Sequence, residues 1–377
     1  MHSFDDAPSS TPEDPSDNRP WYKLLNRYHW FVLIVAALGW LFDTMDQQLF
    51  ALARTPAMRE LLTKVVIEEG VEKKVLPDPA LVAEYGGYAT AIFLLGWATG
   101  GLFFGALGDR FGRAKVMLWT ILLYSLCTGL SALSTNVWDF AFYRFITGLG
   151  VGGEFAVGVA LVAEVMPSKA RPFALGLLQA LSAVGNISAA VINIGMGIAV
   201  TEHGTVGGTN MAPWRMMFVV GTLPALLAIL IRRNLKEPEQ WAKQAGQKKG
   251  NILSSFGELL SDARWRKNAL IGLTLGFAGV VGLWGIGFFT FDLLSNVLRA
   301  RFEAEGIPKE QIAPKIAFWT GMTSIFQNFG AFFGVYGFSY LAHYLGRRTS
   351  FAIAFLAAMC STAYVFAFFS NFHKSSG

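Results

Sequence analysis

Charged residues are scarce in this chain of 377 residues: they make up 15% of the sequence, whereas 53% of the residues are hydrophobic. Soluble globular domains carry about 25% charged residues, so the composition excludes an ordinary soluble protein. Cysteine is also rare, with Cys127 and Cys360 alone, and both lie inside apolar runs. A disulfide framework is therefore not expected, and the two thiols are expected to pack as small apolar side chains.

The motifs of several other protein classes are missing as well. We find no phosphate-binding P-loop, dinucleotide-binding fingerprint or nucleophile elbow, which argues against an ATP-driven pump and against a membrane enzyme. His and Cys do not cluster at metal-ligand spacing, so we expect neither a metal nor another cofactor. The formal net charge is +5, but no nucleic-acid-binding motif accompanies it, and nucleic acid is not an expected partner.

Long apolar runs make up most of the remaining sequence. A helix needs about 20 apolar residues to cross the hydrocarbon core of a bilayer. Nine segments meet this requirement: 30–51, 86–107, 115–134, 138–163, 172–200, 214–232, 268–292, 316–341 and 350–370. Several contain clustered glycines, which allow helices to approach closely inside a membrane. The sequence therefore predicts an all-α, multi-pass integral membrane protein.

Polar segments divide the chain into two halves. Residues 1–27 begin as an acidic stretch rich in Ser and Pro and are predicted to form a disordered tail. Residues 233–267 are predicted to link an N-terminal half of six helices, 28–232, to a C-terminal half of three helices, 268–377. Lys and Arg are concentrated in the tail, in the linker and in the other segments between spans that fall on the same side of the membrane as the tail. The positive-inside rule therefore places the N-terminus and the linker in the cytoplasm, with the protein in the cell (inner) membrane.

The turn between the second and third predicted spans reads "GALGDRFGRAK", from Gly105 to Lys115. It places the carboxylate of Asp109 near helix ends and lets Arg113 pair with acidic groups across the interface between the halves. A weaker copy, "LAHYLGRRTS", follows the eighth predicted span and keeps the same Gly-Arg pair at a constant offset. The two halves are therefore expected to be structural repeats.

The first of these motifs resembles the loop between helices two and three of the major facilitator superfamily. Residues 143–171, "YRFITGLGVGGEFAVGVALVAEVMPSKAR", resemble the fourth-helix signature of its sugar porter branch, and "LKEPEQW" looks like the segment after helix six. The resemblance covers about residues 28–370 and implies a major facilitator-type bundle. It also implies a cytoplasmic gate network of Asp109, Arg110, Arg113, Glu164, Arg171, Arg347 and Arg348.

Four ionisable side chains fall inside the predicted spans: Asp43, Asp46, Arg144 and Glu154. Such a group is costly in hydrocarbon unless it is paired or lines water, so each is a functional candidate. Asp46 and Arg144 fall at similar depths if the first helix runs outward and the fourth inward, and they are predicted to meet. A purely structural pair is the alternative. Asp292 is expected at a helix end, in contact with solvent.

The surrounding residues suggest roles for these groups. The D-x-x-D pattern in the first helix resembles proton-coupled aromatic-acid symporters, and the Gly-Gly-Glu in the fourth resembles organic-acid and sialic-acid carriers. The guanidinium of Arg144 can hold a carboxylate through two parallel hydrogen bonds. Gln179, Gly185 and Asn186 of the fifth helix match the sugar porter pattern instead. The predicted substrate-binding residues are Arg144, Asp46, Gln179 and Asn186, and the predicted proton-coupling residues are Asp43 and Glu154.

Three functions remain open at this point. The favoured one is a secondary active transporter that carries a small organic anion together with protons by alternating access. A sugar:proton symporter is the first alternative. The second belongs to another class: a truncated, non-transporting membrane protein, because the second half holds fewer spans than the first. The expected partners are a small-molecule substrate, protons and the lipid bilayer. The oligomeric state is left open.

The predicted orientation can be tested by labelling single cysteines with a membrane-impermeant thiol reagent. Cysteines introduced at Ala114 and Gln247, in a variant without the two native thiols, should stay unlabelled in intact cells and react after permeabilisation. Both positions lie in segments rich in Lys and Arg, which stay in the cytoplasm. Labelling of either cysteine in intact cells would reverse the orientation.

Overall fold

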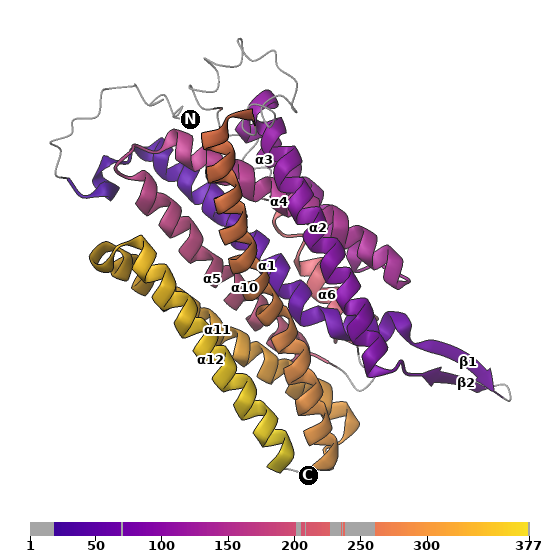
Figure 1. Cartoon of the computed structure of the whole chain (residues 1–377). Helices are drawn as coiled ribbons and strands as arrows, with labels where there is room; N and C mark the ends of the chain where they lie inside the picture. The colour runs from indigo at the N-terminus through magenta and orange to yellow at the C-terminus, as the bar shows by residue number, and fades with distance from the viewer. Residues whose placement is uncertain are drawn as a thin grey trace.

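The computed structural model describes residues 19–68, 71–200, 205–207, 209–226, 235, 237 and 261–375. Within these ranges the chain forms a bundle of long helices (Figure 1). A short 3-10 helix, η1 (Trp21–Leu24), comes first. The α-helices are α1 (Arg27–Leu62), α2 (Pro79–Phe111), α3 (Arg113–Ser131), α4 (Val137–Val165), α5 (Arg171–Ile198), α6 (Pro213–Val220), α10 (Ala263–Ala304), α11 (Lys309–Leu345) and α12 (Arg347–Ser375).

The predicted membrane spans coincide with these helices. By length and composition, six stretches of the described chain could cross a membrane: α1 to α5, and residues 348–368 of α12. Helices α10 and α11, of 42 and 37 residues, cover two further predicted spans. Residues 227–232 of the sixth predicted span, residues 1–18 of the predicted tail and most of the predicted linker lie outside the described residues. The expected all-α membrane bundle is confirmed.

Two local features differ from the sequence-based prediction. Strands β1 (Lys64–Glu68) and β2 (Val71–Val75) pair antiparallel and project from one end of the bundle, where only a loop was expected (Figure 1). The end of the supposedly disordered tail is ordered, because the ring of Trp21 stacks on that of Phe173 with centroids 5.8 Å apart. The aromatic contact fixes this segment against α5.

The helix boundaries follow from local chemistry. The side chain of Asn26 accepts a hydrogen bond from the backbone N–H of His29, and the His29 ring accepts one from the Asn26 N–H. This reciprocal cap starts α1. The turns at Gly112 and Gly346 have φ angles of 108° and 78°, in the region that favours glycine. Each glycine separates two long helices, so the two copies of the repeated motif form equivalent turns.

Helices α2 and α4 pack with their backbones in close contact along a row of glycines. A Cβ added at Gly96, Gly100, Gly148 or Gly152 would collide with backbone atoms of the other helix. Small residues allow this approach, which membrane helices use in place of a hydrophobic driving force. The first half is therefore held together by contacts that leave no room for a larger side chain.

The two halves meet mainly along α5 and α11, and α11 also contacts α10 and α12. Polar side chains bridge this interface. The Asn186 amide donates to the Asn328 Oδ1 at 2.7 Å, the Asn193 amide donates to the Ala317 carbonyl at 3.0 Å, and Gln48 Nε2 lies 2.9 Å from the Ser324 hydroxyl. Since all three contacts join separate halves, any motion of one half against the other must rearrange them.

The close contact of α2 and α4 leads to a stability prediction. Gly152→Val should lower the thermal stability of the purified protein by several degrees, because overpacking typically costs about 1–3 kcal/mol. Gly176→Ala is the matched control, since a Cβ at Gly176 would meet nothing within 4 Å. Thermal unfolding in detergent measures both variants. Equal stability of the valine variant and the parent would contradict the packing argument.

Candidate functional site

A cavity of about 540 Å³ lies between the two halves. Helices α1 and α5 contribute one wall, and α10 and α11 contribute the other. Side-chain amides make up much of the polar lining, and none of the described lining residues carries a charge. The amide residues are Gln47, Gln48, Gln179, Asn186, Gln327 and Asn328, and the aromatic ones are Trp40, Phe291, Phe332 and Phe338. Such a site can hold a ring between aromatic faces and bind polar groups through neutral donors and acceptors.

Two lining side chains carry polar atoms without hydrogen bonds. Gln47 is 2% exposed, and neither its amide nitrogen nor its amide oxygen has a partner. The indole Nε1 of Trp40 is buried and unpaired as well. Buried polar groups are nearly always satisfied, so each exception needs an explanation. Here both residues line the cavity, which makes them candidates for contact with a bound molecule.

Residues along α5 are more buried toward one end of the cavity than toward the other. Along α5, Asn193 is 9% exposed and packs against α11, whereas Gln179 is exposed within the cavity wall. Asn186 lies between them in sequence and is half-buried. The predicted substrate residues Gln179 and Asn186 are therefore brought together in the cavity, on the same face of α5.

The predicted proton-coupling residues lie inside the first half. Asp43 is 0% exposed and Glu154 is 1% exposed, and their carboxyl groups lie close enough for each to affect the charge of the other. Neither oxygen of Asp43 makes a hydrogen bond, and the nearby hydroxyl of Tyr124 is also unpaired. Gly39 lets this arrangement form, because a Cβ there would collide with the Glu154 carboxylate. Two carboxylates without a cation can share one proton but are costly when both are charged.

Asp46 and Arg144 meet, as their predicted depths suggested. Arg144 Nη1 lies 3.4 Å from the Asp46 Oδ2, and the Thr128 hydroxyl donates to Asp46 Oδ1 at 2.7 Å. Two other guanidinium nitrogens bond to the Ser131 hydroxyl at 2.8 and 3.1 Å. Both charged side chains are 0% exposed. Phenylalanine rings surround the guanidinium: Phe50, Phe140 and Phe218.

This pair does not line the cavity in the described conformation. Arg144 could contact a substrate only if the helices around it move and expose the guanidinium. The structure therefore separates the predicted substrate residues into two groups. Gln179 and Asn186 face the cavity, whereas Arg144 and Asp46 lie within the first half.

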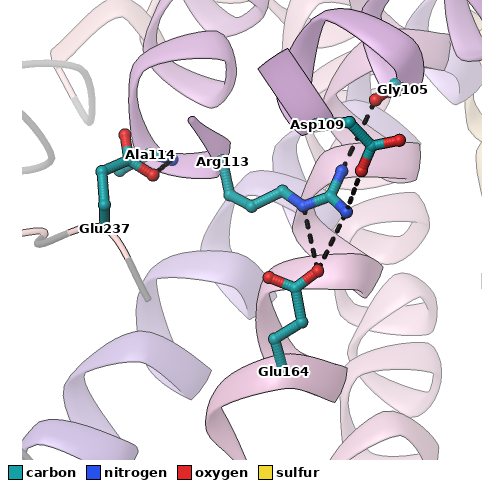
Figure 2. Close-up of polar contacts among 6 residues, drawn as sticks. All are labelled: Gly105, Asp109, Arg113, Ala114, Glu164 and Glu237. Atoms are coloured by element: carbon teal, nitrogen blue, oxygen red, sulfur yellow. Dashed lines mark hydrogen bonds and ion pairs between the residues drawn. The ribbon is translucent and has the colours of Figure 1, made fainter. Parts of the chain in front are cut away.

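Three of the predicted gate residues, Asp109, Arg113 and Glu164, meet at the junction of α2, α3 and α4 (Figure 2). Arg113 Nη2 donates to Asp109 at 2.6 Å and to Glu164 at 2.9 Å, and its Nε donates to Glu164 at 3.2 Å. Arg110 lies over the ring of Phe111. These contacts of Arg113 all lie within the first half, so the part of the network that the structure describes forms there.

The remaining predicted gate residues are Arg171, Arg347 and Arg348. The Nε of Arg171 is buried and makes no hydrogen bond. Arg348 is exposed near the start of α12, and the side chain of Arg347 lies outside the described part of the structure. The predicted pairing of the cluster with this loop of the second half therefore stays a prediction.

Sequence analysis missed Glu237, which lies in the "LKEPEQW" segment. Its two carboxylate oxygens accept hydrogen bonds from the backbone N–H groups of Ala114 and Lys115, each at 3.1 Å (Figure 2). These groups form the N-terminus of α3, which favours a negative charge. The sequence did show a carboxylate in this segment, and the segment itself was identified by its resemblance to the family. No feature of the sequence indicated which groups the carboxylate would bind.

Sequence analysis also misplaced Arg54 and Asp292. The first predicted span ends at residue 51 and leaves Arg54 outside it, and Asp292 is predicted at a solvated helix end. Both lie within long helices, and their side chains form an ion pair between α1 and α10. Arg54 is 1% exposed and Asp292 16%. Helix α1 continues to Leu62, past the predicted end at residue 51, because Pro56 does not end it. Arg54 follows Ala51 at helical spacing, and this spacing was the feature of the sequence that could have indicated a longer helix.

Comparison with known families and proteins identifies the class. The model of the Major Facilitator Superfamily matches residues 75–376. The chain belongs to the major facilitator superfamily of membrane transporters, and the resemblance found in its motifs is confirmed.

Two solved structures share the fold. The proton:xylose symporter XylE bound to 6-bromo-6-deoxy-D-glucose matches with a TM-score of 0.51 and 16% identity, over 90% of this chain and 96% of that chain. A D-xylose-proton symporter matches with a TM-score of 0.50 and 20% identity, over 78% and 66%.

Curated relatives are transport proteins of bacteria. A putative metabolite transport protein of Haemophilus influenzae is 31% identical over 342 residues, which cover 89% of this chain and 73% of that protein. The sialic acid transporter of Escherichia coli is 30% identical over 63% of this chain and 51% of its own length. The niacin transporter of Acinetobacter baylyi is 30% identical over 56% and 42%. The chain thus spans about half the length of the latter two.

The gate cluster leads to a prediction about its two carboxylates. Glu164→Gln should destabilise the protein by about 1 kcal/mol, and Asp109→Asn by less, because an exposed ion pair is worth little. Glu164 is 26% exposed and accepts two hydrogen bonds from Arg113, whereas Asp109 is 46% exposed and accepts one. Thermal unfolding of the two variants beside the parent gives the order. A larger loss from Asp109→Asn would contradict it.

Proposed function

We propose that this protein is a secondary active transporter that moves a small organic anion together with protons by alternating access. The observation that carries the proposal is the cavity between the two halves, closed at one end by contacts of α5 with α11 and of α1 with α10. A binding site at the junction of two repeats can be exposed to either side by a rocking motion.

The orientation of the cavity follows from the proposed topology. With the N-terminus in the cytoplasm, the motif turn at Gly112 lies on the cytoplasmic side, and Arg54 lies toward the opposite side along α1. The described conformation is then open toward the cytoplasm and closed outward. The gate cluster of Arg113 fits this state, because all of its described ion pairs lie within one half. We propose that the outward-open state brings it into contact with α12.

Proton coupling is assigned to Asp43 and Glu154. Their carboxyl groups face each other in the interior of the first half, without a cation between them. Desolvation disfavours the charged form of a carboxylate, and a second carboxylate nearby adds to the effect. A site of this kind can bind a proton and release it when water reaches it. Asp43 lies one helical turn from Gln47 on α1, so a proton on Asp43 can influence the cavity wall.

The choice of an organic acid rests on the relatives and on the cavity together. The names of several relatives specify carboxylic acids: sialic acid, niacin, cis,cis-muconate and benzoate. The amides of Gln47, Gln179 and Asn186 can donate to a carboxylate, and the neighbouring aromatic rings suit a planar substrate. Arg144, held by Asp46, is a further proposed carboxylate ligand for a conformation in which it becomes accessible.

A sugar is the second candidate substrate. Neutral amides in a cavity without charged lining residues suit hydroxyl groups, which need both donors and acceptors. A panel of radiolabelled carboxylates and sugars, assayed for uptake into proteoliposomes with an imposed pH gradient, distinguishes the two. Uphill uptake of a carboxylate supports the proposal, and uptake of sugars alone would replace it with the alternative. No flux of any solute would favour the non-transporting class.

The coupling assignment makes a prediction for the same assay. Asp43→Asn or Glu154→Gln should abolish uphill accumulation driven by a pH gradient, because the variant cannot take up the transported proton at this pair. Exchange of substrate across the membrane, which needs no net proton movement, should remain partly intact. Glu84→Gln is the control, since Glu84 is exposed on α2 and accepts a hydrogen bond from the exposed Tyr88 hydroxyl. Normal accumulation by both carboxylate variants would place the coupling site elsewhere.

A further inference from the structure

The ion pair between Arg54 and Asp292 joins the two halves of the protein. Arg54 also donates to the hydroxyl of Thr90 on α2 at 2.6 Å, and its guanidinium lies 5.5 Å from the ring of Phe289 on α10. The hydroxyl of Thr55 donates to the other oxygen of Asp292 at 2.5 Å. Three helices therefore meet at one buried guanidinium, which is 1% exposed.

The pair lies at the closed end of the cavity. The lining residues of α1 follow one helical face from Trp40 through Thr44 and Gln47 to Ala51. Arg54 and Thr55 occupy the next turn of that face, because residues three or four apart in a helix lie above one another. On α10, Phe291 lines the cavity and Asp292 follows it directly. The ion pair thus stands between the cavity and the end of the bundle that carries the β-hairpin.

Opening this end requires Arg54 and Asp292 to separate. Thr90 and Arg54 belong to the same half and stay together, whereas Asp292 moves with α10. Removing one partner of a buried ion pair leaves an uncompensated charge, which is strongly unfavourable. The guanidinium therefore needs water or another anion once Asp292 has left.

The surroundings of the pair favour an anion. Farther along the same two helices, Arg59 and Arg299 both interact with the single carboxylate of Glu303. These two guanidinium groups and one carboxylate leave a net positive charge on this part of α1 and α10, which favours an approaching anion. A guanidinium presents a planar pair of N–H donors that matches a carboxylate, and a carboxylate from Asp292 already occupies that place in the closed state.

We propose that Arg54 binds the carboxylate of the substrate when the cavity opens at the α1–α10 end, and that Asp292 replaces this carboxylate when the end closes. The proposal rests on the proposed function as an organic-anion transporter. It accounts for a cavity whose described lining residues carry no cation: in the closed state the cation is held by Asp292. The substrate then contacts only neutral groups, which favours its release at the other end.

The experiment compares a carboxylate with its own amide. Benzoate and benzamide, and nicotinate and nicotinamide, serve as probes for binding to the parent and its variants in proteoliposomes. A cysteine in place of Ala51, on a background without the native thiols, reports whether the closed end has opened to an impermeant reagent. Ala51 lines the cavity and is 6% exposed.

Asp292→Asn removes the internal carboxylate and keeps the shape of the side chain. It should increase labelling of the cysteine and strengthen binding of the carboxylate probe by about tenfold relative to its amide. The double variant Arg54→Gln with Asp292→Asn leaves no buried charge at this site, and it keeps the test informative if the single variant folds poorly. It should label as readily as the single variant but lose the preference for the carboxylate.

Glu60→Gln is the matched control at the same end. Glu60 pairs with Arg215 at 3.0 Å, and both belong to the first half, so the substitution should change neither labelling nor the carboxylate preference. The proposal would be overturned if Asp292→Asn strengthened binding of the acid and of the amide equally, or if the double variant kept the preference for the carboxylate. The ion pair would then only hold α1 and α10 together. If the parent binds none of these carboxylates, the proposed function fails, and this proposal with it.

Discussion

A charge inside the apolar part of a membrane protein must find a counter-charge, a hydrogen-bonding partner or water, and this constraint determines how the helices of the bundle are arranged. Arg144 is enclosed by phenylalanine rings and bound to Asp46 and Ser131 within the first half. Arg54 satisfies the same requirement across the interface, with Asp292. One pair therefore stabilises a half, whereas the other stabilises one particular arrangement of the two halves.

The contact of Asp43 with Glu154 meets the constraint in another way. The two groups carry the same charge when ionised, so a proton is the simplest counter-ion available to them. A structural role alone would be served better by an acid and a base. The contrast between this pair and the neighbouring Asp46–Arg144 pair is the physical basis for assigning the proton to Asp43 and Glu154, and the assignment remains a proposal.

Much of the architecture could be predicted from the sequence because it is local. Runs of apolar residues give the helices, and the Gly112 turn gives the junction of α2 and α3. Arg113 was expected to pair with acidic groups, and it does so with Asp109 across the Gly112 turn. The meeting of Asp46 and Arg144 could also be inferred, since helix direction and depth fix where two buried residues of neighbouring helices lie.

Contacts between distant segments could not be predicted in this way. Nothing in the sequence relates Arg54 to Asp292, because neither residue belongs to a recognisable motif. The predicted end of the first span, at residue 51, also left Arg54 outside the helix. The carboxylate of Glu237 was equally unassignable, since its partners are backbone N–H groups that no side-chain pattern reveals. The wall of the cavity that α11 forms was not predictable either. Packing decides which face of α11 meets α5, and the sequence of α11 alone does not show this.

The glycine contacts between α2 and α4 have a mechanical consequence. Two helices whose backbones touch along several turns cannot slide or bend separately, so they move as one stiff rod. A helix of 33 residues such as α2 is about 50 Å long. A tilt of about 10° about one end would carry the other through roughly 9 Å, more than the width of a carboxylate. The same rod carries Asp109 at its tip and Glu154 near its middle, so a push on the surface turn is transmitted directly to the buried acid.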